Sequence, residues 1–309
     1  MAVTTEQVVA APGWFTAAIA ELPEHREVEV GGAAIHLRCW GRAGTPGVVL
    51  VHGGSAHSGW WDHIAPFLAT THRVVALDLS GHGDSGVRAG YPIEGWADEV
   101  MAAAEAGGIA GRPYIVGHSM GGRVTAVVGA RHRKSVAGLV IIDSPISEPP
   151  RDALVGQLRR KPKTYPTKDE ICERFRTVPE QAVLLPYVAR HVAGESVRST
   201  PEGWVWKFDP EMLRKRLEHG RIPPLSSLKT VEAPVLYIRC EFGLVTSERA
   251  QEIAGLFGHP ATVVDLAAAG HHPMMDQPLP LVATLRTALA QWGSLNESGR
   301  PDAPAHNLH

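Results

Sequence analysis

Hydrophobic residues in this chain fall into short continuous runs that alternate with segments of helical spacing. Runs rich in valine, isoleucine and leucine predict strands that are buried on both faces of a sheet. Between these runs, apolar residues recur every three or four positions, which predicts helices. The predicted strands are 47–53, 73–79, 112–119, 136–143, 233–239 and 261–266, and the predicted helices are 60–70, 94–106, 120–132, about 247–257 and about 279–293. Strands that alternate with helices indicate a parallel sheet covered on both faces, which is the α/β class.

Polar and apolar residues alternate in two segments near the N-terminus, 26–30 and 34–40. Alternation predicts strands with one exposed face, and Gly31-Gly32 between the segments predicts a tight hairpin turn. The residues before the hairpin, 1–25, are expected to form a peripheral arm with a short helical stretch.

The alternation of strands and helices stops after residue 144 and resumes near residue 231. The intervening segment has no buried-strand run, and its apolar spacing predicts helices at about 169–176, 179–193 and 209–219. The pattern therefore predicts one α/β core with a helical insertion, followed by a polar tail that is expected to be disordered. The predicted boundaries are 26–145 and 231–293 for the core, 146–230 for the insertion and 294–309 for the tail.

The composition is typical of a globular protein and argues against several classes of partner. The 309 residues carry a formal net charge of −2, which gives no reason to expect nucleic acid or an anionic membrane as a partner. No apolar run approaches the roughly 20 residues of a membrane span, and the N-terminus lacks a secretion signal, so a cytoplasmic location is expected. The widely spaced Cys39, Cys172 and Cys240 indicate neither a disulfide framework nor a zinc site.

The segment GHSMG places Ser119 between two glycines at a predicted junction of strand and helix. This G-x-S-x-G pattern is typical of a turn that holds a nucleophilic serine at the carboxyl edge of the sheet, where open α/β folds bind ligands. Side chains at Gly117 and Gly121 would collide with the flanking strand and helix. A glycine-rich turn with a capping serine is the alternative interpretation, and the strand–helix context favours the nucleophile.

A serine nucleophile needs two preorganised N–H donors for the oxyanion that forms during acyl transfer. One candidate is the backbone N–H of Met120, the residue after the serine. The other is expected from the loop after strand 47–53, where the segment HGG points to the N–H of Gly54. A flexible strand exit is the alternative interpretation of these two glycines.

Five segments together resemble the α/β-hydrolase superfamily, and they occur in the order of that family. They are VLVHGGSAHSGWWDHIAPFLA, HRVVALDLSGHGDSG, YIVGHSMGGRV, GLVIIDSP and AAGHHPMMDQP. The resemblance implies the α/β-hydrolase fold, a mostly parallel eight-stranded sheet with helices on both faces and an inserted helical cap. It also implies that Asp78 and the glycines of DLSGHGDSG shape their loop rather than react.

The resemblance further implies a histidine base after the last strand. In AGHHPMMDQP the G-H-x-P pattern of the family matches His271, and His272 at the variable position is the alternative base. A neutral imidazole takes the proton of the serine and later returns it to the leaving group. His118, beside the serine in the sequence, is expected to have a packing role.

The acid of the triad is missing from its commonest position, because Gly243 stands where most relatives have an aspartate. Some relatives, including a group of haloalkane dehalogenases, take the acid from the end of the sixth strand instead. Asp143 holds that position here, and together with Gly243 it resembles that arrangement. Glu241 is the alternative acid, and a site without any acid is the third interpretation.

The cap of the family lies over the edge of the sheet, excludes water and shapes the substrate pocket. The side chains expected to line such a pocket are His52, Ser55, Trp60, Trp204, Trp206 and Phe242. A small core within the cap is an equally good interpretation of the aromatic residues.

These observations lead to the hypothesis of a serine hydrolase that cleaves a carboxylic ester, or a lactone, of a small to medium apolar substrate through an acyl-enzyme. Its partner is the small-molecule substrate, and the chemistry needs no metal and no organic cofactor. The rival hypotheses are a C–C bond hydrolase of the meta-cleavage type and a receptor-like hydrolase with little turnover. The absent aspartate at position 243 counts against the first rival, whose members usually keep it, and supports the second.

Overall fold

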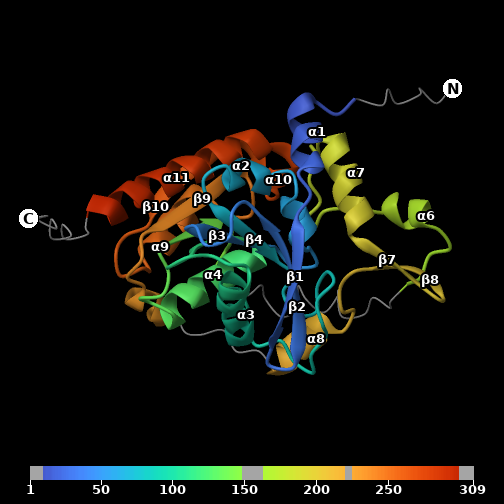
Figure 1. The fold of residues 1–309 in the computed structure, drawn as a ribbon, viewed down its shortest axis with the longest axis horizontal. Coiled ribbons are helices and arrows are strands. Elements are labelled where there is room, and N and C mark those ends of the chain that lie inside the picture. The colour runs from blue at the N-terminus through green and yellow to red at the C-terminus, as the bar shows by residue number, and fades with distance from the viewer. Residues whose placement is uncertain (1–9, 148–162, 220–224, 299–309) are drawn as a thin grey trace, which may run out of the picture.

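The computed structural model describes residues 10–147, 163–219 and 225–298, and its centre is an eight-stranded sheet (Figure 1). The strand order is β1-β2-β4-β3-β5-β6-β9-β10. Strand β2 is antiparallel to β1 and β4, and the other neighbours are parallel, so the predicted mostly parallel sheet is confirmed. The strands are β1 Glu24–Val30, β2 Ala33–Trp40, β3 Gly47–Val51, β4 Arg73–Leu77, β5 Tyr114–His118, β6 Gly138–Ile142, β9 Val235–Phe242 and β10 Thr262–Gly270.

Helices cover both faces of the sheet, and the central strands β3, β4, β5 and β6 are buried at every position. In β3, Val48 and Leu50 join one hydrophobic cluster, and Val49 and Val51 join the other. Helices α3, α4 and α9 pack on one face, and α1, α2 and α11 pack on the other (Figure 1). The bounds are α1 Gly13–Ala20, α2 Ala65–Ala69, α3 Ile93–Ala106, α4 Met120–Arg131, α9 Ser247–Ala254, α10 Pro273–Asp276 and α11 Pro278–Ser298, with 3₁₀ turns at Ser58–Trp61 and Leu225–Thr230.

The N-terminal hairpin forms as its alternating pattern predicts. Strands β1 and β2 pair in a register that places Val28 opposite Ile35. Gly31 and Gly32 make the turn with φ angles of 52° and 82°, a left-handed backbone that glycine adopts without strain. In the preceding arm, α1 packs Phe15 into the core.

The insertion contains helices and also a β-hairpin that the sequence pattern did not indicate. Its described elements are α6 Lys168–Cys172, α7 Pro186–Glu195, β7 Val197–Thr200, β8 Gly203–Trp206 and α8 Met212–His219. The expectation of a helical insertion is therefore incomplete, because residues 197–206 form strands. These strands are short and largely half-buried, so they lack the continuous apolar run that marks the core strands. Residues 148–162 and 220–224 of the predicted insertion lie outside the described residues.

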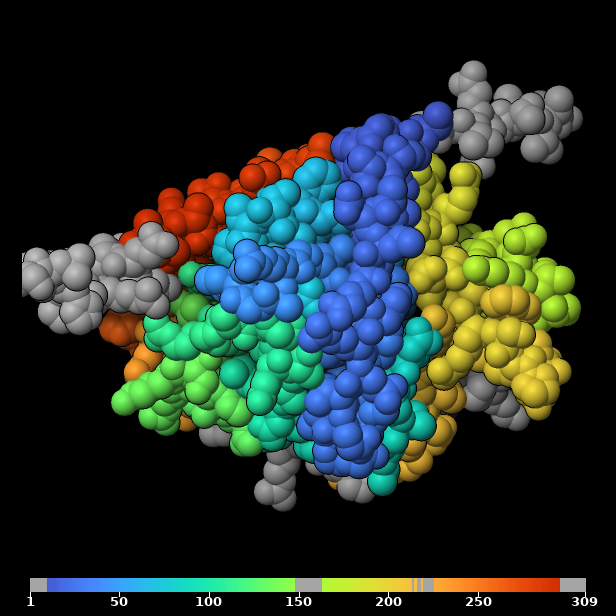
Figure 2. Space-filling model, viewed as in Figure 1, coloured from blue at the N-terminus to red at the C-terminus, as the bar shows by residue number. Residues whose placement is uncertain are grey.

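A cluster of charged side chains holds the insertion against the core. Arg38 of β2 donates to Asp62 at 2.8 Å and to Glu195 of α7 at 2.6 Å. His191, also on α7, contacts the same Asp62 at 2.9 Å. The cluster thus fixes α7 beside β2, and the insertion stands next to the N-terminal hairpin in the space-filling view (Figure 2).

The last helix extends further than the sequence predicts. Helix α11 runs to Ser298, so the expectation of a disordered tail is wrong for 294–298, and 299–309 lie outside the described residues. A helix that already exists gains one hydrogen bond for each residue it adds, so polar residues can extend its end. Within the described ranges, no helix has both the length and the apolarity that crossing a membrane requires.

Candidate active site

Ser119 occupies a sharp turn between β5 and α4, with a φ of 54° and a ψ of −116°. A positive φ at a residue with a side chain costs on the order of 1–3 kcal/mol, so the surrounding structure must impose it. A Cβ on Gly117 would lie 2.2 Å from the carbonyl oxygen of Gly121, and a Cβ on Gly121 would lie 2.5 Å from the carbonyl oxygen of His52. Close packing therefore requires both glycines, as the G-x-S-x-G pattern predicts.

The side chains of Ser119, His271 and Asp143 form one chain of hydrogen bonds. His271 Nε2 lies 3.0 Å from Ser119 Oγ, and His271 Nδ1 lies 2.7 Å from Asp143 Oδ2. Because an ionised carboxylate only accepts, Nδ1 carries the proton and donates it to Asp143. This tautomer leaves a lone pair on Nε2 that accepts from the serine hydroxyl. His271 and Asp143 are both buried, which limits competition from water for these bonds.

Asp143 follows β6 and is held by backbone groups at the end of β9. Its Oδ2 accepts from the N–H of Leu244 at 2.7 Å, and its Oδ1 lies 3.5 Å from the backbone nitrogen of Cys240. A Cβ built on Gly243 would lie 2.3 Å from Oδ2. Glycine at position 243 therefore leaves the room that the Asp143 carboxylate occupies beside His271.

The hydrogen bonds of the site support neither the alternative acid, Glu241, nor the alternative base, His272. Glu241 is exposed, and its Oε2 accepts from the backbone N–H of Ala268 in β10 at 2.8 Å. The carboxylate that meets His271 is that of Asp143, and the ring that meets the Ser119 hydroxyl is that of His271 rather than His272.

The loop after β3 lies directly beside Ser119. A Cβ built on Gly53 would lie 3.4 Å from Ser119 Cβ, and one built on Gly54 would lie 3.8 Å from Met120 Sδ. Ser55 continues the loop with a φ of 58° and is exposed. The two expected oxyanion donors, the N–H groups of Gly54 and Met120, thus belong to neighbouring segments.

His52 supports this loop, because both nitrogens of its ring form hydrogen bonds with backbone groups. Nδ1 donates to the carbonyl oxygen of Gly53 at 2.7 Å, and Nε2 accepts from the N–H of Leu79 at 3.0 Å. Burial lowers the pKa of His52, so the ring is neutral and keeps one donor and one acceptor. Both nitrogens are used by backbone groups, so His52 acts as a brace and not as the pocket residue that we expected.

Asp78 shapes the neighbouring loop, as the resemblance implies. Its carboxylate accepts from the N–H of Ser58 at 2.6 Å, from the N–H of Asp84 at 2.9 Å and from His36 Nδ1 at 2.9 Å. Burial opposes ionisation, but the hydrogen bond from His36 holds the pKa of Asp78 well below its usual range. The carboxylate is therefore ionised and committed to the loop.

A strip of aromatic rings connects the insertion to the site. The ring of Trp60 lies 5.4 Å from that of His272 and 6.0 Å from that of Phe175. Phe175 in turn lies 6.4 Å from Trp206 of β8. Two of the expected pocket residues, Trp60 and Trp206, thus belong to one apolar wall that reaches the histidines after β10.

The other two expected aromatic residues lie outside this wall. Trp204 pairs through its backbone with Tyr165 and carries the Lys168 ammonium 5.8 Å from its ring, so it belongs to the packing of the insertion itself. Phe242 is 70% exposed, and the expectation that it lines an enclosed pocket is wrong. The pairing of β9 with β6 ends at Ile238, but β9 continues to Phe242. Phe242 therefore lies beyond the part of β9 that β6 covers.

Two residues of the insertion that the sequence did not single out also contact the site. Phe175 completes the aromatic strip, and Gln181 Oε1 accepts from the backbone N–H of His272 at 2.8 Å. A Cβ on Gly270 would lie 2.4 Å from Gln181 Cδ, so the amide packs closely against the end of β10. Apolar spacing predicted helices across both positions, but α6 ends at Cys172 and α7 begins only at Pro186. The segment between these helices is positioned by tertiary contacts, which carry no sequence signal.

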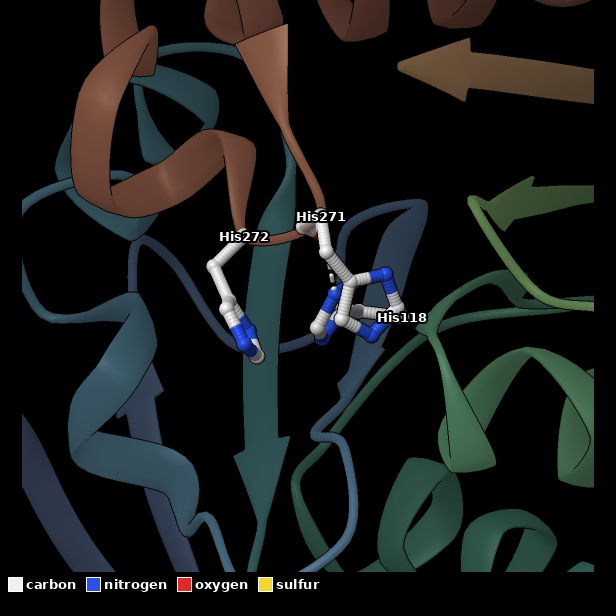
Figure 3. Close-up of side chains that lie close together, drawn as sticks. All are labelled: His118, His271 and His272. Carbon is white, nitrogen blue, oxygen red and sulfur yellow. Dashed lines mark hydrogen bonds between the residues drawn. The ribbon is translucent and has the colours of Figure 1, made fainter. Parts of the chain in front are cut away.

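Three histidine rings lie together where β5 and β10 end (Figure 3). His118 packs here as expected, and its Nε2 donates to the carbonyl oxygen of His271 at 2.7 Å. Burial lowers the pKa of His118 well below its usual range, and proximity to the other two rings acts in the same direction. Burial also lowers the pKa of His272 to about 3. Both rings are therefore neutral at pH 7.

A separate cavity of about 390 Å³ lies between the β1–β2 turn and the start of α3. Its lining includes Gly31, Tyr91, Trp96 and Glu99. None of its lining residues belongs to the hydrogen-bonded chain at Ser119, so we assign this cavity no part in the reaction.

The strand order, the serine in a strained turn between strand and helix, and the histidine after the last strand together define the α/β-hydrolase fold. The chain belongs to the alpha/beta hydrolase family, whose sequence profile matches residues 48–285.

Two curated relatives show the range of this similarity. The chain is 25% identical to the esterase Rv0045c of Mycobacterium tuberculosis over 276 residues, which cover 87% of this chain and 90% of that protein. It is 37% identical over 128 residues to the dihydrolipoyllysine-residue acetyltransferase component of the acetoin cleaving system of Pseudomonas putida. That match covers 40% of this chain and only 34% of the relative, so the chain spans about a third of the acetyltransferase component.

Solved structures share the fold across nearly their whole length. The E-2-(acetamidomethylene)succinate hydrolase superposes with a TM-score of 0.74 at 19% identity, covering 87% of this chain and 99% of that chain. The thioesterase domain from the curacin biosynthetic pathway superposes with a TM-score of 0.70 at 23% identity, covering 85% and 99%. At these identities the comparison concerns the fold alone.

Proposed function

We propose that this protein is a serine hydrolase that cleaves a carboxylic ester of a small to medium apolar substrate through an acyl-enzyme. The observation that carries the proposal is the continuous hydrogen-bonded chain from Ser119 Oγ through His271 to Asp143 Oδ2. A serine hydroxyl is a weak nucleophile on its own, and an adjacent base that is oriented by an acid activates it.

In the first half of the reaction, Ser119 Oγ attacks the carbonyl carbon of the ester while His271 Nε2 takes the hydroxyl proton. Asp143 stabilises the imidazolium that results and keeps the ring in its tautomer. The N–H groups of Met120 and Gly54 receive the oxyanion, and the positive end of α4 adds to this stabilisation. His271 then protonates the departing alcohol, and the acyl group remains on Ser119.

In the second half, a water molecule gives its proton to His271 and attacks the acyl carbon. The tetrahedral oxyanion forms again at the same two N–H groups. The proton returns to Ser119 Oγ as the carboxylic acid leaves. His271 mediates every proton transfer and the backbone N–H groups stabilise the oxyanion, so the proposed cycle requires neither a metal nor an organic cofactor.

The surroundings of Ser119 support an apolar substrate and a carboxylic ester. The strip of Trp60, Phe175 and Trp206 offers an apolar wall for an acyl or alcohol group. The similarity to the esterase Rv0045c, and to pimeloyl-[acyl-carrier protein] methyl ester esterases over parts of the chain, agrees with ester cleavage.

Cys39, Cys172 and Cys240 are free thiols, which supports our proposal of a reducing, cytoplasmic location.

A panel of p-nitrophenyl esters with acyl chains of increasing length tests the proposed reaction. We expect hydrolysis with a rapid first release of p-nitrophenol wherever deacylation is slow, because the acyl-enzyme then accumulates. A ring-fission dienoate serves as the comparison substrate. Turnover of the dienoate without ester hydrolysis would replace our proposal by C–C bond hydrolysis. Failure to turn over either substrate, with a serine that still reacts with fluorophosphonates, would favour a receptor-like protein.

The crowding at position 243 gives a further prediction. Gly243→Ala places a methyl carbon 2.3 Å from Asp143 Oδ2, so the carboxylate must move away from His271. A misplacement of about 1 Å costs on the order of 10²-fold in rate, and we expect a loss of that size in kcat. Gly255→Ala is the matched control, because its added Cβ meets other atoms only at 3.5 Å and beyond. Equal ester hydrolysis by the two variants would contradict the role of Asp143.

A further inference from the structure

The rings of His118, His271 and His272 form a compact group that the hydrolytic cycle uses only in part (Figure 3). Their centroids lie 4.8 Å apart for His118 and His271, 4.6 Å for His271 and His272, and 5.2 Å for His118 and His272. One ring nitrogen from each lies within 4.8 Å of those of the other two, and all three residues are buried. The cluster joins β5 to the segment after β10, so ligand spacing along the sequence did not indicate it.

Two of these rings are held as metal-binding histidines are usually held. His271 donates from Nδ1 to the carboxylate of Asp143, and His118 donates from Nε2 to the carbonyl oxygen of His271. Each ring therefore keeps a lone pair on its other nitrogen, and that of His271 Nε2 is the one that faces Ser119 Oγ. Histidines that bind a metal almost always donate their second N–H to a carboxylate or a backbone carbonyl, which fixes the tautomer and raises the basicity of the ligand.

His272 provides an independent indication of a ligand. The residue is only 5% exposed, and neither Nδ1 nor Nε2 makes a hydrogen bond of normal geometry to a described residue; the backbone groups that act on the ring are those of Val178 and Pro179. A buried polar group without a partner costs on the order of 1–3 kcal/mol, so such a group calls for an explanation. A bond from one of these nitrogens to a metal ion would offset that cost.

We propose that His118, His271 and His272 bind a divalent transition-metal ion of the zinc type, and that the bound ion stops hydrolysis by occupying Nε2 of His271. Neutral imidazole nitrogens are the ligands that such ions prefer, and three of them leave a fourth tetrahedral position for water or for Ser119 Oγ. Zinc–nitrogen bonds of about 2.0–2.1 Å place the ligand nitrogens about 3.4 Å apart, so the rings must close in. His272 is the ring with no side-chain hydrogen bond to hold it back.

The two parts of this proposal depend on different premises. Binding of the ion rests on the three rings alone. Inhibition rests on the proposed function, because the lone pair of His271 Nε2 cannot bind the ion and accept the proton of Ser119 at the same time. The ion would therefore act as a reversible inhibitor that competes with catalysis for one nitrogen.

Calorimetric titration of the metal-free protein with Zn²⁺ tests the binding part. We expect one ion per chain for the wild type and affinity that is at least about tenfold weaker in His272→Ala. His259→Ala is the matched control, since His259 is an exposed histidine outside the cluster. His272→Asn, which keeps a polar side chain, replaces the alanine variant if that variant does not fold. Equal affinity in the His272 and His259 variants, or no site of one ion per chain, would overturn the proposal.

Ester hydrolysis and the rate of fluorophosphonate labelling at Ser119, each measured with Zn²⁺ and then with EDTA, test the inhibition part. The rates of every variant are expressed relative to its own metal-free rate. We expect Zn²⁺ to suppress both reactions of the wild type, EDTA to restore them, and His272→Ala to need at least about tenfold more Zn²⁺. Undiminished hydrolysis at saturating Zn²⁺ would overturn inhibition while leaving the proposed function intact. Absence of hydrolysis in the metal-free wild type would instead reject the proposed function, and calorimetry would still decide the binding site.

Discussion

Ser119→Ala is expected to lower kcat for ester hydrolysis by about 10⁶-fold, the size of loss that follows removal of a catalytic serine. Alanine keeps the turn between β5 and α4 but removes the oxygen that attacks the ester. The residual rate would come from the oxyanion donors and from substrate binding, which act without a nucleophile. Initial rates with the best p-nitrophenyl ester of the panel measure the effect.

Two controls distinguish loss of the nucleophile from a general loss of structure or activity. Ser135→Ala, at an exposed serine after α4, should keep the wild-type rate because Ser135 lies outside the hydrogen-bonded chain. Thermal unfolding of Ser119→Ala should occur near the wild-type temperature, since the buried packing of the turn is unchanged. A Ser119→Ala variant within tenfold of the wild-type kcat would show that the nucleophile lies elsewhere.

Asp143→Asn should lower kcat by about 10⁴-fold, because an amide at this position favours the wrong tautomer of the histidine. In the wild type, Nδ1 of His271 donates to Asp143 Oδ2 at 2.7 Å and Nε2 is free to accept. Glu241→Gln is the matched control, since Glu241 bonds to Ala268 and not to His271. Full activity in Asp143→Asn together with a loss in Glu241→Gln would reverse the assignment of the acid.

The geometry at position 243 allows a stronger form of this prediction. An aspartate side chain spans about 2.4 Å from Cβ to a carboxylate oxygen, and a Cβ at position 243 would lie 2.3 Å from the place of Asp143 Oδ2. An aspartate at 243 can therefore put an oxygen where Asp143 now has one, once the Asp143 side chain is removed. We expect Asp143→Ala to be nearly inactive and the double variant Asp143→Ala/Gly243→Asp to recover at least about tenfold in kcat.

A double variant no more active than Asp143→Ala would mean that the space at Gly243 does not serve as a second route to His271. Gly243→Asp in the presence of Asp143 is the control for this experiment. It should lose activity, because the two side chains compete for one position.

The sequence predicted best those features that depend on local pattern. The central strands carry continuous, mostly apolar runs and are buried at every position. The turn at Ser119 needs glycine on both sides because of contacts within a few residues or with the adjacent strand. Where the pattern was weak, the predictions were incomplete. The strands β7 and β8 are short and largely half-buried, so they lack a continuous apolar run. The helical spacing of the segments around them led us to predict a helical insertion and to miss the hairpin.

The choice of acid could not be settled from the sequence because it depends on distances between segments far apart in the chain. Asp143 follows β6, and Glu241 lies near the end of the neighbouring strand β9. The structure distinguishes them because Asp143 accepts from the N–H of Leu244 in the space beside Gly243, whereas Glu241 accepts from the N–H of Ala268. The contacts of Phe175 and Gln181, the exposure of Phe242 and the grouping of the three histidines depend on tertiary packing in the same way.

Labelling of the protein with a fluorophosphonate, followed by mass spectrometry of its peptides, tests the central claim most directly. The reagent forms a covalent bond with a serine only where a base activates the hydroxyl and N–H donors stabilise the oxyanion. We predict one adduct per chain, on the peptide that contains Ser119, formed rapidly by the wild type and far more slowly by Asp143→Asn. No adduct on the wild type, or an adduct on a different residue, would contradict the assignment of Ser119 as the nucleophile of this hydrolase.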